Sequence, residues 1–185
     1  MLQRRRFIAA SALLAAGGVR AQPADFWARL REGGNVVLMR HARFGAGVGD
    51  PPDFRLGECT TQRNLSAEGR EQARRVGEAF RREAIRFDEV RSSAWCRCVD
   101  TAQLAFGRHV VWAPINSFFG GAQARETQTR EVLAAVPSLR APGNWMLVTH
   151  QVNITALTGL VPSEGEGVVL RPGAGEPEVI GRVGG

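Results

Sequence analysis

Two short apolar runs, each ending at a histidine, constrain the fold of this chain more than any other feature. The first run, residues 35–39, leads into Arg40 and His41, and the second, residues 144–148, leads into Thr149 and His150. Continuous apolar runs of this length are typical of strands that are buried on both faces, as in parallel sheets. The pattern therefore predicts a parallel sheet with polar residues gathered at the carboxyl ends of its strands.

The rest of the chain alternates between helical and strand patterns. Helices are expected over residues 24–32, 66–83, 95–106, 124–135 and 151–158, and further strands over 87–93, 109–113 and 167–170. A Gly-rich tail follows and is expected to be frayed. Helices that alternate with strands predict an α/β protein, a three-layer sandwich with a mostly parallel central sheet, in a single domain over residues 22–185.

One long segment does not fit this alternation. Residues 44–63 are rich in Gly, Pro and polar side chains and have no apolar periodicity. A loop of this length is longer than a simple connection requires, and such loops often shape a binding site. We expect it to lie beside the carboxyl ends of the strands.

The first 21 residues have the pattern of a secretory signal peptide. An arginine-rich start precedes an apolar stretch over residues 9–19 and a small-x-small cleavage motif ending at Ala21. The pair Arg4-Arg5 favours twin-arginine export over the general secretory route. The apolar stretch is too short and too rich in Gly and Ala to form a stable membrane anchor. These features predict an exported, periplasmic protein whose mature chain begins near Gln22.

The basic composition points away from nucleic acid as a partner. All 24 basic residues are arginine, and removal of the first 21 residues lowers the formal charge from +6 to about +2. The mature protein is therefore nearly balanced in charge, and a nucleic-acid partner is not expected. Because no apolar stripe stands out on the predicted surface, we expect a monomer.

Three cysteines, Cys59, Cys96 and Cys98, would face an oxidising compartment. One disulfide and one free thiol is the simplest arrangement, and Cys59 is one partner because Cys96 and Cys98 are too close in the chain to pair well. Whether Cys59 pairs with Cys96 or Cys98 remains open, as does an arrangement of three buried thiols. A zinc site is disfavoured because no histidine lies near these cysteines.

The strand ends predict which chemistry this sheet supports. They supply Arg40 and His41, a serine pair at 92–93 with Arg97 soon after, and His150. The planar fork of an arginine matches phosphate oxygens, and a histidine can attack phosphorus. A cluster of carboxylates for a metal is missing. The set therefore favours phosphoryl transfer with no metal and no other cofactor.

These residues carry a resemblance to the histidine phosphatase superfamily, which includes phosphoglycerate mutases and acid phosphatases. Arg40-His41-Ala42 resembles the Arg-His-Gly nucleophile motif, with alanine in place of glycine. Three further motifs follow in the order of the family, at residues 64–73, 92–102 and 148–150. The resemblance covers most of the mature chain and implies a phosphoglycerate mutase-like fold.

The resemblance also implies roles for individual residues. His41 attacks the phosphoryl group and carries it as a phosphohistidine that water later hydrolyses, while Arg40, Arg97 and His150 bind the phosphoryl oxygens. Either histidine alone is as readily explained as a structural residue at a strand end, but the two histidines and two arginines together favour catalysis. His109 lies in no motif and is expected to be structural.

The sequence departs from the family at the general acid, the group that protonates the leaving alcohol. Relatives supply a glutamate after the third strand or an aspartate directly after the second histidine, whereas here residues 115–119 contain no acid and Gln151 follows His150. Glu126 is the nearest substitute, although a solvated charge at a helix start explains it equally well. Gln151 and Arg43 are further candidates for substrate binding.

The sequence as a whole predicts a metal-independent phosphomonoester hydrolase that acts on a small phosphorylated substrate or on a glycan phosphate of the cell envelope. The alternative is a non-catalytic phosphate- or phosphoglycan-binding protein that has lost its general acid. A phosphohistidine phosphatase that acts on signalling proteins fits the size of the chain but conflicts with the export signal. Mutase activity is disfavoured because it requires cytoplasmic substrates.

Overall fold

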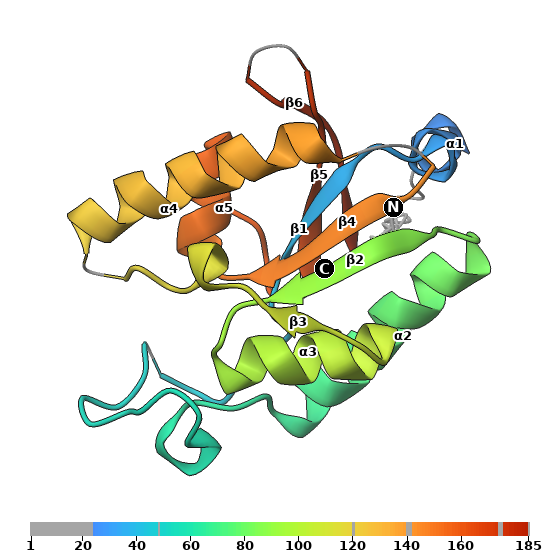
Figure 1. The fold of residues 1–185 in the computed structure, drawn as a ribbon. Helices are drawn as coiled ribbons and strands as arrows, with labels where there is room; N and C mark the ends of the chain where they lie inside the picture. Colours follow the sequence, from blue (N-terminus) through green and yellow to red (C-terminus); the bar gives the residue numbers. More distant parts are fainter. Residues whose placement is uncertain (1–23, 48, 120, 140–141, 174–175, 185) are drawn as a thin grey trace, which may run out of the picture.

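The computed structural model describes residues 24–47, 49–119, 121–139, 142–173 and 176–184 (Figure 1). The expected signal peptide at residues 1–21 lies outside these ranges. Within the described ranges, helices are too short or too polar to cross a membrane.

A six-stranded sheet forms the centre of the molecule. Its strands are β1 (Val36–Arg40), β2 (Phe87–Ser92), β3 (Val110–Val111), β4 (Asn144–Thr149), β5 (Glu166–Arg171) and β6 (Glu178–Gly184), arranged in the order β3-β2-β4-β1-β5-β6. The first four strands in this order are parallel, β5 is antiparallel to β1, and β6 is antiparallel to β5. The predicted α/β fold with a mostly parallel sheet is confirmed.

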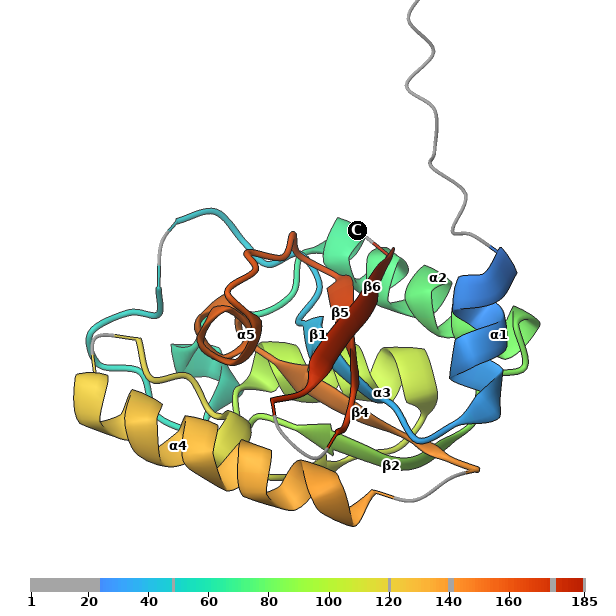
Figure 2. The same cartoon turned by 90° about the horizontal axis from the view of Figure 1, so that it is seen from above.

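Helices cover both faces of this sheet. One face packs against α1 (Ala24–Glu32), α2 (Ala67–Arg82) and α3 (Cys96–Phe106), and the other packs against α4 (Ala122–Ala135) and α5 (Gln151–Thr158) (Figure 1). Short 3-10 turns occupy Cys59–Thr61, Ala113–Ile115 and Val136–Ser138. Figures 1 and 2 both place the cyan loop after β1 and the yellow start of α4 at the end toward which the parallel strands run.

The continuous apolar pattern of β1 reflects its burial between two cores. Val37 and Met39 pack into the core beneath α1, α2 and α3, whereas Val36 and Leu38 pack into the core beneath α4 and α5. Successive side chains of a strand point to opposite faces, so a strand covered on both sides needs an apolar residue at every position. The same requirement accounts for the run in β4.

The helix α2 begins as the sequence predicts. The Ser66 hydroxyl accepts a hydrogen bond from the Gly69 amide at 3.1 Å and so caps the helix. Further along, Gly77 allows α2 and α3 to approach closely, because a Cβ at this position would lie 2.0 Å from the Ala105 carbonyl oxygen. The two helices therefore form a closely packed pair beneath the sheet.

The prediction of a frayed Gly-rich tail is wrong. Residues 178–184 form β6, which pairs with β5, and Val183 lies buried in the core beneath α1 and α2. The local sequence gives no sign of this, because the hydrogen bonds and the burial come from a distant partner strand. The third strand is shorter than predicted: only Val110–Val111 pairs with β2, and the turn that contains Pro114 follows.

Candidate active site

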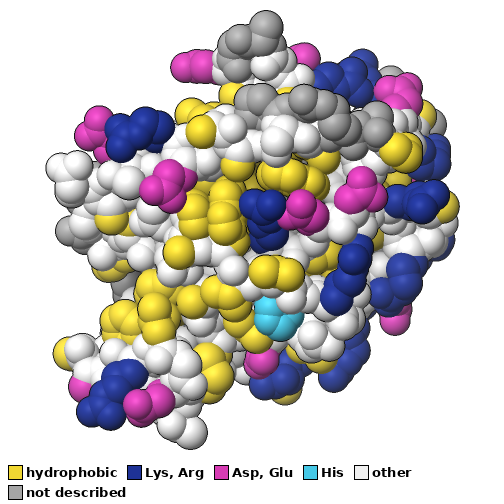
Figure 3. Space-filling view, in the orientation of Figure 1, with side chains coloured by type: hydrophobic (Ala, Val, Ile, Leu, Met, Phe, Trp, Pro, Cys, Tyr) yellow, Lys and Arg dark blue, Asp and Glu magenta, His cyan; other side chains and the backbone are white. Residues whose placement is uncertain are grey.

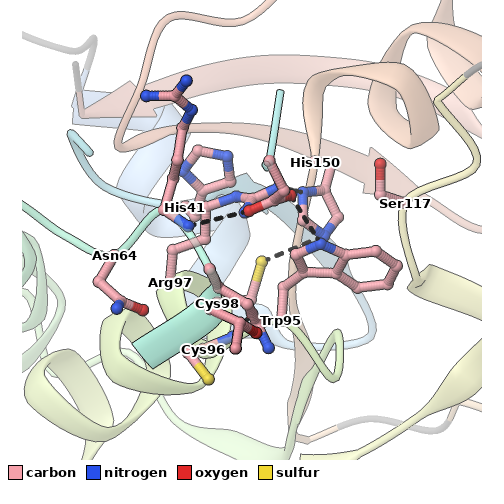
Figure 4. Close-up of polar contacts among 12 residues, drawn as sticks. His41, Asn64, Trp95, Cys96, Arg97, Cys98, Ser117 and His150 are labelled. Atoms are coloured by element: carbon pink, nitrogen blue, oxygen red, sulfur yellow. Dashed lines mark hydrogen bonds and ion pairs between the residues drawn. The ribbon is translucent and has the colours of Figure 1, made fainter. Parts of the chain in front are cut away.

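The carboxyl ends of β1, β4 and β2 meet at one edge of the sheet. The His41 amide donates to the Thr149 carbonyl at 2.9 Å, and the Ser93 amide donates to the Val148 carbonyl at 2.9 Å. The rings of His41 and His150 consequently lie edge to face, with centroids 5.4 Å apart and an interplanar angle of 67° (Figure 4). The convergence of the two histidines predicted from the strand ends is present in the structure.

A cavity of about 690 Å³ opens above these strand ends. Arginine and histidine side chains line the bottom of this cavity. We call them the cavity floor: Arg40, His41, Arg97 and His150. We call the side chains above it the cavity wall, contributed mainly by loops and including Phe44, Asp50, Phe54, Trp95, Phe119 and Glu164. Figure 3 shows hydrophobic side chains gathered around a hollow on this side of the molecule.

His41 is held in one tautomer. Its Nδ1–H donates to the Ala42 carbonyl oxygen at 2.9 Å, which leaves the lone pair of Nε2 free. Burial is the main cause that lowers the pKa of His41 to about 3, and the charges of Arg97 and Arg40 act in the same direction. The side chain is therefore a neutral imidazole with a free nucleophilic nitrogen.

Ala42 replaces the glycine of the usual nucleophile motif without disturbing this geometry. The Ala42 backbone does not have a positive φ, a conformation that among the non-glycine residues of the described ranges occurs at Ala84. Its methyl group packs in a small buried cluster with Leu65 and Ala73. The Ala42 amide donates to the Thr101 hydroxyl at 3.0 Å, which ties the loop after His41 to α3.

His150 is held by a chain of hydrogen bonds. Its Nδ1 faces the Arg97 guanidinium at 3.4 Å and accepts from it, so the ring proton lies on Nε2 and points to the Ser93 hydroxyl at 2.8 Å. The Ser93 hydroxyl in turn donates to the Asn116 side-chain oxygen at 3.2 Å. Burial, followed by the neighbouring His41 and Arg97, holds the pKa of His150 well below its usual value.

Arg97 pairs with a carboxylate that the sequence analysis did not identify. Its Nη1 donates to the two Asp50 oxygens at 2.8 and 3.0 Å, and both side chains are nearly buried, at 8% and 7% exposure. Asp50 also accepts from the Trp95 indole at 2.9 Å and from the Arg63 amide at 3.0 Å. These four contacts use the acceptor positions of the carboxylate and attach the loop after β1 to the cavity floor.

Arg40 has a looser carboxylate partner. Its Nη2 lies 3.6 Å from Glu164 Oε1, and its Nη1 donates to the Pro162 carbonyl at 3.0 Å. The Nε atoms of both Arg40 and Arg97 are buried and have no hydrogen-bond partner. Buried donors of this kind are usually satisfied, so the floor presents unused N–H groups to an anion.

The motif on α2 acts as a support for the nucleophile loop. Gln72 accepts from the Arg43 amide at 3.0 Å and donates to the Glu164 carbonyl at 2.8 Å. A Cβ at Gly69 would lie 1.8 Å from the Arg43 carbonyl oxygen, so glycine permits the close approach of helix and loop. The Gly165 amide donates to the His41 carbonyl at 3.0 Å. These contacts bring Glu164 to the edge of the cavity.

The cysteines form the predicted combination of one disulfide and one thiol. Cys59 pairs with Cys96, which fastens the 44–63 loop to the start of α3 beside Arg97. Cys98 is the buried free thiol, and burial raises its pKa to about 12. Its sulfur lies 3.5 Å from His150 Nε2, so Cys98 packs behind the cavity floor as a protonated thiol.

The structure gathers some of the remaining candidates and separates others. Gln151 lines the cavity, but the Arg43 side chain is exposed outside it. Glu126 lies on α4 and lines a different hollow with Arg125 and Arg130, so the structure does not support it as the acid of this site. No cluster of three or more His, Cys, Asp or Glu side chains suited to a metal ion occurs in the described part of the chain.

Comparisons with known proteins agree with this geometry. The family model of the histidine phosphatase superfamily (branch 1) matches residues 36–117. This stretch contains Arg40, His41 and Arg97, and ends before His150. No curated protein sequence matches the chain.

Solved structures with a similar fold include several phosphatases. A protein assigned as the phosphohistidine phosphatase SixA of Agrobacterium tumefaciens is 21% identical, with a TM-score of 0.56 over 82% of this chain and 98% of that one. The phosphoserine phosphatase of Entamoeba histolytica, a mutant in complex with phosphoserine, is 13% identical, with a TM-score of 0.59 over 80% and 95% of the two chains. The protein histidine phosphatase SixA in complex with tungstate is 12% identical, with a TM-score of 0.58 over 81% and 96%. At these identities the similarity lies in the fold.

Proposed function

We propose that this chain, whose residues 36–117 match the family model of the histidine phosphatase superfamily (branch 1), hydrolyses phosphomonoesters through a phosphohistidine at His41, without a metal ion. The match to this family supports the prediction of a phosphatase enzyme. The observation that carries the proposal is the free Nε2 of a neutral His41 inside an arginine-containing cavity floor. A protein that only binds phosphate would need the arginine donors but not this nucleophile.

In the first step, Nε2 of His41 attacks the phosphorus atom. A bond forms between nitrogen and phosphorus while the bond between phosphorus and the ester oxygen breaks. Arg40 and Arg97 offer their unused Nε–H groups to the phosphoryl oxygens and offset the charge that spreads over them. The arriving dianion also reverses the electrostatic balance at His150, so that its ring can take up a proton and donate to a phosphoryl oxygen.

Glu164 is the group that protonates the leaving alcohol. Its side chain lines the cavity, is 28% exposed, and makes one long ion pair of 3.6 Å with Arg40, so it remains accessible to the leaving oxygen and to water. Asp50 is less suitable because its oxygens already make four contacts with three nitrogen donors. In the second step the Glu164 carboxylate takes a proton from the attacking water, phosphate is released, and His41 returns to its neutral form.

We also propose where this reaction takes place. The signal-like start of the chain indicates export to the periplasm, where a small phosphorylated molecule or an envelope glycan phosphate would be the substrate. The arrangement supports a monomer as the working unit, because a single chain supplies both histidines and both arginines of the cavity floor.

The experiment that tests the proposed function is hydrolysis of p-nitrophenyl phosphate between pH 4 and 8 in the presence of EDTA. We expect turnover by the wild-type protein and its loss in His41→Ala, while His109→Ala, which removes a histidine outside the cavity, retains turnover. If the wild-type protein binds vanadate but shows no turnover, the non-catalytic binding protein replaces this proposal. If His41→Ala remains active, the phosphohistidine mechanism is wrong.

A further inference from the structure

The cavity wall differs in chemistry from the cavity floor. Aromatic side chains reach it from separate parts of the chain: Phe44 after β1, Phe54 in the 44–63 loop, Trp95 before α3 and Phe119 before α4. Phe54 and Trp95 lie with ring centroids 5.7 Å apart and an angle of 34°, which gives them a shared apolar surface. Pro51 and Pro52 extend this surface. A leaving group held above His41 therefore meets these rings as well as the Glu164 carboxyl group.

Phe119 is unusual among these residues because it is 73% exposed although it lines the cavity. A large apolar side chain that is left open to water at the mouth of a site gains free energy when a ligand covers it. The ring of Phe44 lies against the nucleophile His41 at a centroid distance of 5.2 Å. The apolar surface thus extends from the nucleophile to the cavity mouth.

The charges around the cavity are balanced before any substrate binds. Among the described lining residues, the charged side chains are Arg40 and Arg97 with their partners Glu164 and Asp50. A phosphoryl group uses the donors of both arginines. A second anionic group on the substrate would face Asp50 or Glu164 with no further cation to pair with, and burial of an unpaired charge is strongly unfavourable.

Polar side chains of the wall are few. Apart from the floor and the two carboxylates, Ser117 and Gln151 are the polar side chains among the described lining residues. These two could bind one or two hydroxyl groups, whereas the remaining side-chain surface of the wall is apolar. Recognition of a leaving group would therefore depend mainly on contact with the aromatic rings.

We propose that the site selects phosphomonoesters whose leaving alcohol is uncharged and carries a flat apolar ring. This inference rests on the proposed function and, for the same cavity, favours the small phosphorylated molecule over the envelope glycan phosphate. Esters whose alcohol carries a carboxylate, such as phosphoserine or a phosphoglycerate, are poor substrates because the balanced wall offers their charge no partner.

The test compares esters of primary alcohols, so that differences in bond reactivity stay small. We expect kcat/KM for benzyl phosphate to exceed that for ethyl phosphate by about tenfold, mainly through KM, with phosphoserine and 3-phosphoglycerate lower still. Choline phosphate tests for a cationic leaving group and should not exceed ethyl phosphate. Equal values for all esters, or the highest value for phosphoserine, 3-phosphoglycerate or choline phosphate, would overturn the inference.

Substitutions at the cavity wall supply a second readout. Phe119→Ala changes an exposed side chain and should raise KM for benzyl phosphate several-fold, leave KM for ethyl phosphate unchanged and leave kcat unchanged for both. Val161→Ala, an exposed apolar residue that does not line the cavity, is the matched control. An equal effect of Phe119→Ala on both esters would contradict selection by the wall. Absence of turnover of every ester, p-nitrophenyl phosphate included, would instead overturn the proposed function itself.

Discussion

The cavity floor and the cavity wall are built in different ways. Arg40, His41 and His150 lie at the ends of strands whose main chains bond directly to one another, and Arg97 lies in the first turn of α3. The wall comes mostly from connecting segments, and its positions depend on contacts between residues far apart in the chain, such as Asp50 with Arg97. The floor is therefore fixed by the sheet, whereas the wall is held by side chains and a disulfide.

This difference predicts two kinds of effect, one for substitutions in the floor and one for substitutions in the wall. A change in the floor should reduce the reaction of every phosphate ester, because the floor contacts the phosphoryl group that all of them share. A change in the wall should alter which esters react, or how firmly the wall is held. The predictions that follow test this division, beginning with the largest expected effect.

Arg97→Ala should lower kcat/KM by about 10²–10³-fold for all esters alike, because it removes a buried donor to the phosphoryl oxygens. Arg97 also anchors the 44–63 loop through Asp50, so the ratio of activities on benzyl phosphate and ethyl phosphate should change far less than kcat/KM itself. Arg70→Ala, which removes an arginine that pairs with Asp100 on the surface, is the control and should be silent. A loss that differs strongly between esters would break the division between floor and wall.

Loss of the disulfide should loosen the wall while the floor remains. Cys59→Ser combined with Cys96→Ser removes a link across 37 residues and should lower the free energy of unfolding by about 2–4 kcal/mol. Denaturation in urea measures this change. Reduction of the wild-type protein should give a similar loss, and Cys98→Ala, which keeps the disulfide, should lose the same amount of stability on reduction as the wild-type protein. An unchanged urea midpoint of unfolding in the double variant would contradict the stabilising role of the disulfide.

Glu164→Gln should have an effect that depends on the leaving group. We expect kcat/KM, which reports on the first step alone, to fall by about 10–10²-fold for alkyl phosphates, since an alkoxide needs a proton as it leaves. Nitrophenolate leaves without this help, so p-nitrophenyl phosphate should lose less than about threefold. Glu178→Gln on the surface of β6 is the control. An equal loss for both kinds of ester would remove Glu164 from the role of proton donor.

The pH dependence of stability, compared between the wild-type protein and a variant, reports on the cavity floor. The pKa of His41 is lowered from 6.5 to about 3, so between these values the unfolded chain binds a proton that the folded protein does not. Stability should therefore fall as the pH is lowered below 6.5, by about 1.4 kcal/mol per unit for this residue.

Comparison with His41→Gln isolates this contribution. Because glutamine does not titrate, the free energy of unfolding of the variant should fall less steeply between pH 6.5 and 4 than that of the wild-type protein. Unfolding free energies are measured by urea denaturation at each pH. If they fall equally steeply with pH in the variant and in the wild-type protein, His41 is not held neutral by burial. The same neutral state should keep His41 nucleophilic at mildly acidic pH.

Sequence reasoning predicts the floor residues, the position of the 44–63 loop and the involvement of Gln151, but not the wall residues Asp50 and Glu164. The floor residues follow apolar strands or lie in short motifs, so local pattern and strand-end geometry together predict His41 and Arg97. Asp50 lies in a loop without periodicity, and its partner is 47 residues away, so no local pattern connects the two. Glu164 reaches the cavity through the contacts of Gly165 and Gln72 with distant segments.

The missed elements share the same physical cause. Glu126 was proposed for its nearness in sequence to the third strand, but the orientation of α4 directs it to another hollow. β6 owes its structure to pairing with β5 rather than to its own Gly-containing sequence. In each case a contact between distant segments decides the outcome, and a single sequence carries no direct record of it.

The central claim is that His41 carries the phosphoryl group between the two steps of the reaction. Rapid acid-free quenching during turnover of p-nitrophenyl phosphate, followed by mass spectrometry of peptides at alkaline pH, tests it most directly. The account predicts a phosphorylated His41 that is stable to base and labile to acid, formed with a burst of nitrophenolate equal to the enzyme concentration and absent from His41→Ala. A phosphoryl group on any other residue, or steady turnover with no burst and no modified His41, would contradict it.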